Sequence, residues 1–440
     1  MAEPSSVKRR QLLALSATSL PPLILPRHVM GGLDQKSPSN TLNLAGIGIG
    51  GMGGNYLKNL ESENIVALAD VDSKKASKIF ERYPKATRYE DFRVLLEKEK
   101  HIDGVVIGTP DHTHAVIALA ALDLGKHVYC AKPLTRTIAE ARKVTAQAKA
   151  AGVATQMSVQ WNAKESHRLL AEWIADGAIG EVHEVHTWSN RPIWPQGIER
   201  PTETAAVPAH LNWDLWLGPA PIRPYHSAYH PFKWRAWWDF GCGALGDMGC
   251  HHFDPIFRAL KLTAPTSVVA EVEGVHVETA PPASTITYQF PKRGDWPAVK
   301  LVWYDGGRKP ERPVELEKDR KMSDAFGGTL YIGSKGKILT GGLADGPRII
   351  PESAMRAYER PKPTLDRSPG HYAEFIRACK GGPAAGANFN YGGPLCESVL
   401  LGNVAIRSAG QVLEWDATRA QVSNVAEANQ WLQSTDRLGW

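Results

Sequence analysis

The chain has 440 residues, of which 43% are hydrophobic and 22% carry a charge. This balance is that of a globular protein with two or three domains, and it excludes collagen-like, disordered and polytopic membrane classes. The formal net charge is +5, of which residues 1–30 contribute +3. Because the rest of the chain is nearly neutral, we expect no nucleic-acid partner.

A short basic head and an apolar stretch open the chain. Arg9 and Arg10 precede an apolar run from Leu12 to Leu25, which contains Pro21 and is too short to cross ~30 Å of hydrocarbon. We therefore expect no stable membrane span, and we interpret residues 1–36 as an export signal that resembles the twin-arginine type. This predicts a periplasmic protein, or a cytoplasmic one if the signal does not function. The alternative is a basic, apolar N-terminal arm.

A glycine-rich turn follows the first apolar run after this segment. Gly48, Gly50 and Gly53 stand in G-x-G-x-x-G register, and the chain then takes on a helical pattern. In such a turn the first glycine permits a tight bend, the second lets the backbone approach a pyrophosphate, and the third lets helix and strand pack closely. The helix N-terminus beyond attracts phosphate groups. The predicted dinucleotide contacts are Gly48, Ile49, Gly50, Gly51, Met52 and Gly53.

An acidic residue ends the next predicted strand. Asp70 follows the apolar run 64–69, about twenty residues after the glycines. A carboxylate at this place can accept hydrogen bonds from a ribose hydroxyl and would repel a 2′-phosphate, which favours NAD over NADP. Lys74 and Lys75 lie close enough to weaken this preference. The alternative for Asp70 is a residue that caps a helix in a turn.

Strands and helices alternate over the first part of the chain. Predicted helices cover 74–82, 92–98 and 115–124, and predicted strands cover 64–69, 104–107 and 127–129. This alternation predicts a doubly wound parallel sheet, a Rossmann domain over residues 37–160. Strand-like runs after residue 161 predict a second α/β domain over residues 161–440, with a large and mainly antiparallel sheet.

Several motifs in order carry a resemblance to a known family. They are the loop Gly48–Gly53, Thr109-Pro110 with His114, the Lys132-Pro133 pair, and a glycine-rich D-x-x-x-H signature with Asp247 and His251. With these motifs the chain resembles the glucose–fructose oxidoreductase / inositol dehydrogenase / rhizopine-catabolism (Gfo/Idh/MocA) family of NAD(P)-dependent oxidoreductases. The resemblance implies the two-domain fold above, with an open sheet face that commonly supports dimers, so we expect a homodimer or homotetramer.

The resemblance also implies the catalytic residues. Oxidation of a secondary alcohol needs a base near the hydroxyl and a donor that steadies the developing alkoxide. In relatives the corresponding trio does this work, which carries over to Lys132, Asp247 and His251. Asp247 and His251 are four residues apart, so on a helix they share a face. Ala131 departs from the family, which usually has glutamate before the lysine, and this leaves open what orients Lys132.

Further contacts to the cofactor are expected around the ends of the parallel strands. Thr109, Pro110 and His114 belong to the family motif, and Lys132 can lie by the nicotinamide. Gln160 follows the strand at 154–156 and is expected on the nicotinamide side, with a polar residue at a strand end as the alternative.

An aromatic-rich tract with seven tryptophans lies between Trp188 and Trp238. Indole faces pack against sugar C–H surfaces while nearby polar groups bond hydroxyls, which predicts a carbohydrate or polyol pocket. The alternative is that most of these rings belong to the core or to a dimer interface. The expected substrate contacts are Arg191, Trp234, Arg235, Trp238 and His252.

The five cysteines, Cys130, Cys242, Cys250, Cys379 and Cys396, form no C-x-x-C pair, and an odd count argues against a disulfide framework. The run from Cys250 to Asp254 could suggest a metal site, but its spacing matches no standard zinc pattern, so we expect no metal.

These patterns together predict an oxidoreductase that acts on a secondary hydroxyl of a sugar, sugar derivative or polyol. If the protein is exported, little free NAD surrounds it, so a tightly retained NAD is expected. Two alternatives stay open: an NAD-dependent glycoside hydrolase that works through transient ring oxidation and elimination, and a non-catalytic sugar-binding protein.

Overall fold

The computed structural model describes residues 40–440, so the predicted export signal lies outside the described residues. Residues from Leu42 to Trp440 form one compact unit. Its two β-sheets lie in separate stretches of the chain, residues 43–157 and residues 182–422.

The first sheet has six parallel strands in the order β3-β2-β1-β4-β5-β6. Its strands are β1 (Asn43–Ile47), β2 (Asn64–Ala69), β3 (Thr87–Tyr89), β4 (Gly104–Ile107), β5 (His127–Cys130) and β6 (Thr155–Met157). The helices between them are α3 (Met52–Lys58), α4 (Ser73–Arg82), α5 (Phe92–Lys98), α6 (His114–Asp123) and α7 (Ile138–Ala151). The strand order reverses between β1 and β4, and ligands of open α/β sheets bind at such a switch point. The predicted doubly wound sheet is confirmed.

Local sequence explains why these helices begin and end where they do. The side chain of Asp72 accepts a hydrogen bond from the Lys75 backbone at the start of α4. At the start of α7, Thr137 and Glu140 form a capping box, and the helix ends at Gly152 in the left-handed conformation. The four residues of β4 are all buried, as expected for the middle of a parallel sheet.

The second sheet has nine strands in the order β13-β12-β11-β7-β10-β9-β8-β14-β15. Its strands are β7 (Val182–Ser189), β8 (Ser267–Val272), β9 (Ser284–Phe290), β10 (Val299–Tyr304), β11 (Gly327–Gly333), β12 (Lys337–Gly341), β13 (Arg348–Ile350), β14 (Leu413–Asp416) and β15 (Gln421–Val422). All pairs are antiparallel except β7 with β10, which is parallel. The predicted mainly antiparallel sheet is confirmed, with this one exception.

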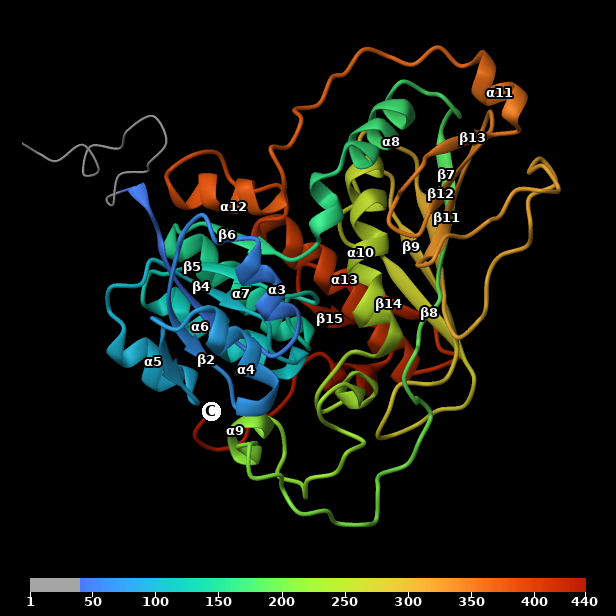
Figure 1. Ribbon diagram of the computed structural model, residues 1–440. Coiled ribbons are helices and arrows are strands. Elements are labelled where there is room, and N and C mark those ends of the chain that lie inside the picture. Colours follow the sequence, from blue (N-terminus) through green and yellow to red (C-terminus); the bar gives the residue numbers. More distant parts are fainter. Residues whose placement is uncertain (1–39) are drawn as a thin grey trace, which may run out of the picture. The chain divides into compact units, whose positions relative to one another are not determined.

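Two long helices connect the sheets. Helix α13 (Phe389–Arg407) contacts α7 of the first domain and β8 of the second sheet, and it packs against α10 (Gly243–Leu260). Helix α8 (Glu165–Ala175) also packs on α10. In Figure 1, α10 and α13 lie between the blue-to-teal first domain and the second sheet. This packing places the start of α10 close to the carboxyl ends of the parallel strands.

A long tract between β7 and α10, residues 190–242, crosses back to the first domain. It contains α9 (Trp213–Leu217) and the short 3-10 helix η4 (Lys233–Ala236). The backbone of Asn212 donates to Val71 O at 2.8 Å, and the backbone of Ser73 donates to His210 O at 3.0 Å. The tract therefore covers the edge of the first sheet where β2 ends.

The remaining elements are η2 (Asp111–Thr113), η3 (Gln160–Ala163), α11 (Glu352–Ala357), α12 (His371–Cys379) and η5 (Ala426–Trp431). None of the helices within residues 40–440 is long and apolar enough to cross a membrane.

Candidate active site

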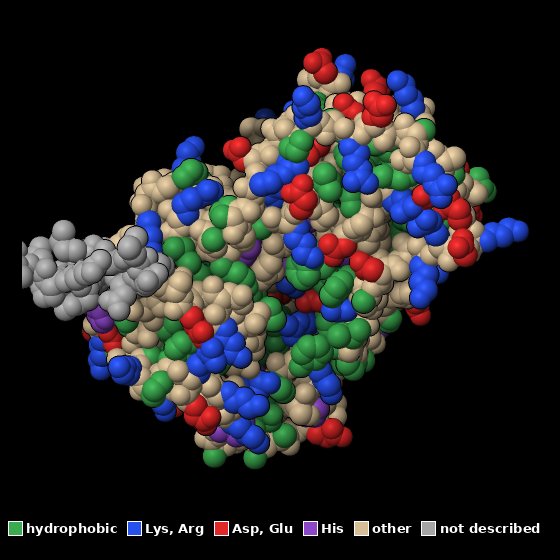
Figure 2. Space-filling model, turned by 45° about the horizontal axis from the view of Figure 1, so that its top comes forward, with side chains coloured by type: hydrophobic (Ala, Val, Ile, Leu, Met, Phe, Trp, Pro, Cys, Tyr) green, Lys and Arg blue, Asp and Glu red, His purple; other side chains and the backbone are tan. Residues whose placement is uncertain are grey.

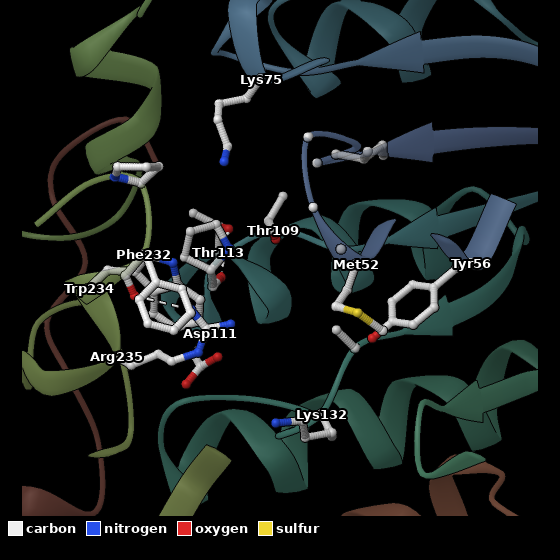
Figure 3. Close-up of a pocket in the computed structure, with 18 of the residues that line it drawn as sticks. Met52, Tyr56, Lys75, Thr109, Asp111, Thr113, Lys132, Phe232, Trp234 and Arg235 are labelled. Atoms are coloured by element: carbon white, nitrogen blue, oxygen red, sulfur yellow. Dashed lines mark hydrogen bonds between the residues drawn. The ribbon is translucent and has the colours of Figure 1, made fainter. Parts of the chain in front are cut away.

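A cavity of about 460 Å³ lies at the carboxyl ends of the parallel strands. The glycine turn after β1 and the ends of β2, β4 and β5 form one side. The start of α10 and the tract 190–242 form the other. A hollow near the middle of the face in Figure 2 has basic, acidic and hydrophobic side chains around it. Figure 3 shows Lys132 and Met52 entering from the first domain and Trp234 and Arg235 from the crossing tract.

The glycine turn has the close approaches that its spacing predicts. Gly48 adopts a φ of 74°, and an added Cβ there would lie 2.6 Å from the Thr109 backbone nitrogen. A Cβ on Gly53 would lie 2.1 Å from Gly48 O, so only glycine lets α3 pack against β1. Gly51 has open space around it and lines the cavity. This open cradle fits a dinucleotide pyrophosphate.

Asp70 lies beside this turn at the end of β2. Its Oδ2 accepts hydrogen bonds from the backbones of Ile49 and Gly50, both at 2.8 Å. Burial raises its pKa to about 6. The side chain lines the cavity next to Lys75, which Figure 3 shows reaching inward. Asp70 therefore closes the glycine turn onto β2. Its predicted hydrogen bonds to a ribose stay a prediction.

Lys132 and Asp247 form an ion pair where the two domains meet. Lys132 Nζ lies 3.0 Å from Asp247 Oδ1 and also donates to the Asp247 carbonyl. Arg191 Nε lies 3.1 Å from Oδ2, and Arg235 Nε lies 3.4 Å from Oδ1. These cations outweigh the effect of burial and hold the pKa of Asp247 well below its usual range. Asp247 is therefore ionised near neutral pH.

His251 lies one turn after Asp247 on α10 and lines the same cavity. Burial and the nearby Lys132 charge lower its pKa well below the usual value. Its Nδ1 is buried without a hydrogen-bond partner among the described residues, and its ring stacks edge-on with Trp161 at 5.7 Å. A neutral imidazole beside a lysine and a carboxylate can accept a proton from a bound hydroxyl.

The other expected cofactor residues divide into two groups. Thr109, Pro110 and Gln160 line the cavity. His114 does not: it is fully buried, and its ring nitrogens lie 2.8 Å from Pro133 O and 2.9 Å from Thr109 O. It thus holds together the two loops that carry the motif. Likewise Ile49 and Gly53 are buried behind the turn and shape it from inside.

Two of the five expected substrate contacts lie elsewhere. Arg191, Trp234 and Arg235 line the cavity, but Trp238 and His252 do not. Trp238 belongs to the hydrophobic core, and the Arg407 guanidinium lies 5.4 Å from its ring. His252 is fully buried between α10 and the sheet, with Nδ1 2.8 Å from Thr187 Oγ1. It points away from the cavity because neighbouring helix residues face different sides.

The tryptophan tract is mostly core, as its alternative interpretation holds. Of its seven tryptophans only Trp216 and Trp234 line the cavity. Three of the remaining five pack with these two in one apolar cluster, whose tryptophans are Trp194, Trp213, Trp216, Trp234 and Trp237. The tract therefore mainly builds a rigid wall against the first domain, and few of its rings face the cavity.

Sequence reasoning missed several cavity residues from distant parts of the chain. The most consequential is Asp111, which is 5% exposed; its burial raises the pKa to about 7, although Lys132 and Arg235 lower it. Its place directly after Thr109-Pro110 was the available signal. Nothing in the local sequence marks several others, among them Tyr56, Trp161, Phe232, Phe326 and Trp440.

No group of three histidine, cysteine, aspartate or glutamate residues within residues 40–440 could hold a metal ion. The cysteines are free thiols; Cys379 is partly buried and the other four are buried.

The switch-point cavity, the glycine turn and the carboxylate after β2 define a Rossmann-type dinucleotide-binding protein. The chain belongs to the Gfo/Idh/MocA oxidoreductase family. Residues 42–159 match the model for its NAD-binding Rossmann fold, and residues 181–440 match the model for its C-terminal alpha/beta domain.

Curated relatives match the chain over part of their length. Inositol 2-dehydrogenase of Rubrobacter xylanophilus is 33% identical over 168 residues, which cover 37% of this chain and 48% of the relative. Levoglucosan dehydrogenase of Pseudarthrobacter phenanthrenivorans is 30% identical over 257 residues, 57% of this chain and 53% of the relative. The chain thus spans about half the length of these relatives.

Solved structures share the fold over most of the chain. The WlbA dehydrogenase from Bordetella pertussis, in complex with NADH and UDP-GlcNAcA, aligns with a TM-score of 0.60 at 15% identity, covering 86% of this chain and 99% of that one. The inositol dehydrogenase homolog from Azotobacter vinelandii, complexed with NADH and myo-inositol, aligns with a TM-score of 0.55 at 16% identity, covering 85% and 98%.

Proposed function

We propose that this protein is an NAD-dependent oxidoreductase that acts on a secondary hydroxyl of a sugar, sugar derivative or polyol. The observation that carries the proposal is the meeting of Lys132, Asp247 and His251 in the cavity that the glycine turn also lines. The open cradle at Gly51 and the carboxylate of Asp70 fit NAD, whose chemistry when bound is to accept the hydride of an alcohol carbon.

Each residue of the trio has a separate task in this proposal. His251, neutral because its pKa is low, accepts the proton of the substrate hydroxyl. The ammonium group of Lys132 donates to the same oxygen and stabilises its developing negative charge. Asp247 stays ionised and holds the Lys132 ammonium at 3.0 Å, so the donor is oriented before the substrate arrives.

The named relatives support this class of substrate. Inositol and levoglucosan are a polyol and an anhydrosugar, and both relatives are dehydrogenases. The glycoside hydrolase alternative has no support among them. Cavity walls that include Trp161 and Trp234 suit the C–H faces of a sugar ring.

A substrate panel with defined variants tests the activity. Purified protein with NAD is mixed with myo-inositol, levoglucosan, and simple sugars and their acids, and the absorbance of reduced nicotinamide is followed. We expect reduction with at least one compound. Lys132→Met and His251→Asn should each lower kcat/KM by ~10²–10⁴, because each removes a group that touches the reacting oxygen.

The matched control is Lys362→Ala, which changes an exposed lysine outside the cavity and should retain full activity. Equal activity of the Lys132 and His251 variants and the wild type would rule out the proposed mechanism. No reduction of NAD by the wild type with any compound would instead favour a sugar-binding protein without catalysis.

We further propose export through the twin-arginine-type segment at Arg9 and Arg10, with NAD retained between turnovers. The basic head and apolar run of the sequence support it. The check is cell fractionation of the wild type and of an Arg9→Lys/Arg10→Lys double variant. Loss of the periplasmic fraction in the variant alone would support export, and equal distribution would contradict it. The expected homodimer or homotetramer stays a prediction, which light scattering of the purified protein can test.

A further inference from the structure

Three cations surround one carboxylate at the catalytic end of the cavity. Lys132, Arg191 and Arg235 all lie within 3.4 Å of the carboxylate of Asp247, and all four side chains line the cavity. A single ionised carboxylate balances one of these charges. The proposed reaction uses the two arginines only to keep Asp247 ionised, and it gives neither of them a contact with the substrate.

Other titratable groups at this end do not restore the balance. His251 is neutral, since burial keeps its pKa low. Asp111 is the second carboxyl here, and its pKa of about 7 leaves it partly protonated near neutral pH. Asp70 and Asp72 lie at the other end, where backbone groups hold Asp70 and His210 and His230 pair with Asp72. The catalytic end therefore carries a surplus of positive charge.

Both arginines also keep hydrogen-bond donors available. Arg191 donates through Nη1 to Asn190 Oδ1 at 2.7 Å, and Arg235 donates through Nη1 to Phe232 O at 3.1 Å. Within residues 40–440 neither Nη2 has a hydrogen-bond partner, and the two side chains keep 17% and 23% of their surface exposed. The Arg235 guanidinium is held over the Trp234 ring, 4.2 Å from its centre, so its direction is set by packing. Figure 3 shows Arg235 entering from the crossing tract and Lys132 from the first domain, and both contact Asp247 Oδ1.

We infer that the substrate is a sugar acid whose carboxylate binds to Arg191 and Arg235 beside the reacting hydroxyl. This inference rests on the proposed function and narrows its substrate class. Guanidinium groups pair with planar carboxylates through two N–H groups, and such charge-assisted bonds are about twice as strong as neutral ones. Because the arginines touch Asp247 directly, the anion must lie within a few bonds of the reacting carbon. A carboxylate attached to the sugar carbon chain meets this condition better than a phosphate ester on a distant hydroxyl.

The inference is tested by direct binding, which does not depend on turnover. Tryptophan fluorescence reports on the cavity because Trp161, Trp216 and Trp234 line it. The NAD-saturated protein is titrated with matched pairs: glucose with glucuronate and gluconate, galactose with galacturonate, and glucose 6-phosphate as the phosphate arm. We expect at least one acid to bind about 10- to 100-fold more tightly than its neutral partner.

Variants assign that preference to the two arginines. Arg191→Gln and Arg235→Gln should each lower the affinity for the acid more than the affinity for the neutral sugar and bring the two within about threefold of each other. Arg235→Lys keeps the positive charge but removes the paired N–H donors of the guanidinium group, so it should retain part of the preference for the acid. Arg200→Gln, in an exposed pair with Glu278 outside the cavity, is the matched control and should retain all of it.

The outcomes separate this inference from the proposed function. The inference is wrong if no acid binds more tightly than its neutral partner, if the phosphate ester alone is preferred, or if the arginine variants weaken acid and neutral sugar equally. If neutral sugars and sugar acids reduce NAD with equal kcat/KM, the protein is an oxidoreductase as proposed, but the inference of a sugar-acid substrate is wrong. Tight binding of an acid without any reduction would support the acid site and contradict the oxidoreductase.

Discussion

Two residues, Asp111 and Ala131, determine which carboxyl groups lie near Lys132. Ala131 stands where the resemblance leads one to expect glutamate, and it lines the cavity without a polar group. Besides Asp247, the carboxyl group near Lys132 is that of Asp111, which comes from the neighbouring strand end after β4. Asp247 orients Lys132 directly. The absent glutamate is therefore no obstacle to an ion pair at this lysine.

Asp111→Asn should stabilise the protein in a pH-dependent way. Burial raises the pKa of Asp111 from 3.8 to about 7, so the folded state keeps its proton where the unfolded state has lost it. Stability therefore falls as pH rises from about 4 to about 7, and the whole penalty applies at pH 8. We expect the variant to raise Tm by ~3–5 °C at pH 8 and by less at pH 5.

Differential scanning fluorimetry at the two pH values measures this difference. Asp247 stays ionised across this range because its pKa is held well below the usual value, and the Cys242 thiol stays protonated because burial raises its pKa well above the usual value. Asp319→Asn, at an exposed position, is the control and should leave Tm unchanged. An equal gain at pH 5 and pH 8 would contradict the assignment to Asp111.

At the scale of elements, two short motifs place most of the site. The glycine turn joins β1 to α3 at the switch point, and the D-x-x-x-H spacing puts Asp247 and His251 on one face of α10. Each motif acts within one element, so its geometry follows from local backbone periodicity. Arg191, in contrast, reaches the cavity beside Asp247 only because β7 ends there, two residues before it.

Gly53→Ala should disrupt the junction of β1 and α3. The new Cβ would lie 2.1 Å from Gly48 O and 3.3 Å from the Gly108 Cα, and backbone atoms cannot move aside as a flexible side chain can. We expect a loss of about 1–3 kcal/mol in the free energy of unfolding and weaker NAD binding. Urea denaturation measures the first, and a fluorescence titration measures the second.

The matched control for this change is Gly336→Ala. A Cβ there would make an ordinary contact of 3.5 Å with Ile179, so stability should change by less than about 0.5 kcal/mol. If both alanine variants are equally stable, the close packing of α3 on β1 does not constrain the turn.

At the scale of the whole described unit, the crossing tract and the last residues of the chain complete the cavity. The Arg437 backbone donates to Pro219 O at 2.9 Å, which ties the end of the chain to the tract. Trp440 then lines the cavity next to Phe92, with the Arg93 guanidinium 4.2 Å from its ring. Parts of the chain more than 300 residues apart thus share one wall near β2 and β3.

Trp440→Ala should weaken NAD binding about 3- to 10-fold, because it removes an apolar wall from the end of the cavity that Asp70 also lines. Isothermal titration with NAD measures the change. Leu438→Ala is the control, since that side chain is fully exposed and should have no effect. Equal affinities of the Trp440 variant and the wild type would show that the end of the chain does not contact the cofactor.

The fold class was predictable because alternating strand and helix patterns are local. The glycine turn was predictable from spacing within one turn, and Asp70 from its place at the end of the next strand. The Asp247–His251 pair came from the resemblance to the family. The wrong substrate contacts, Trp238 and His252, show the limit of this reasoning. Both are adjacent in sequence to regions that line the cavity, but one side chain faces the core and the other faces the sheet.

The sequence by itself determined the two-domain α/β fold, the dinucleotide turn and the types of residue needed for alcohol oxidation. Only the tertiary structure decided which cations surround Asp247, that Asp111 is the second carboxyl, and that Trp440 closes the cavity. The reason is physical: periodicity and turn geometry act over a few residues. The charge balance and the walls of a cavity depend on which distant side chains the packing of α10, α13 and the crossing tract brings together.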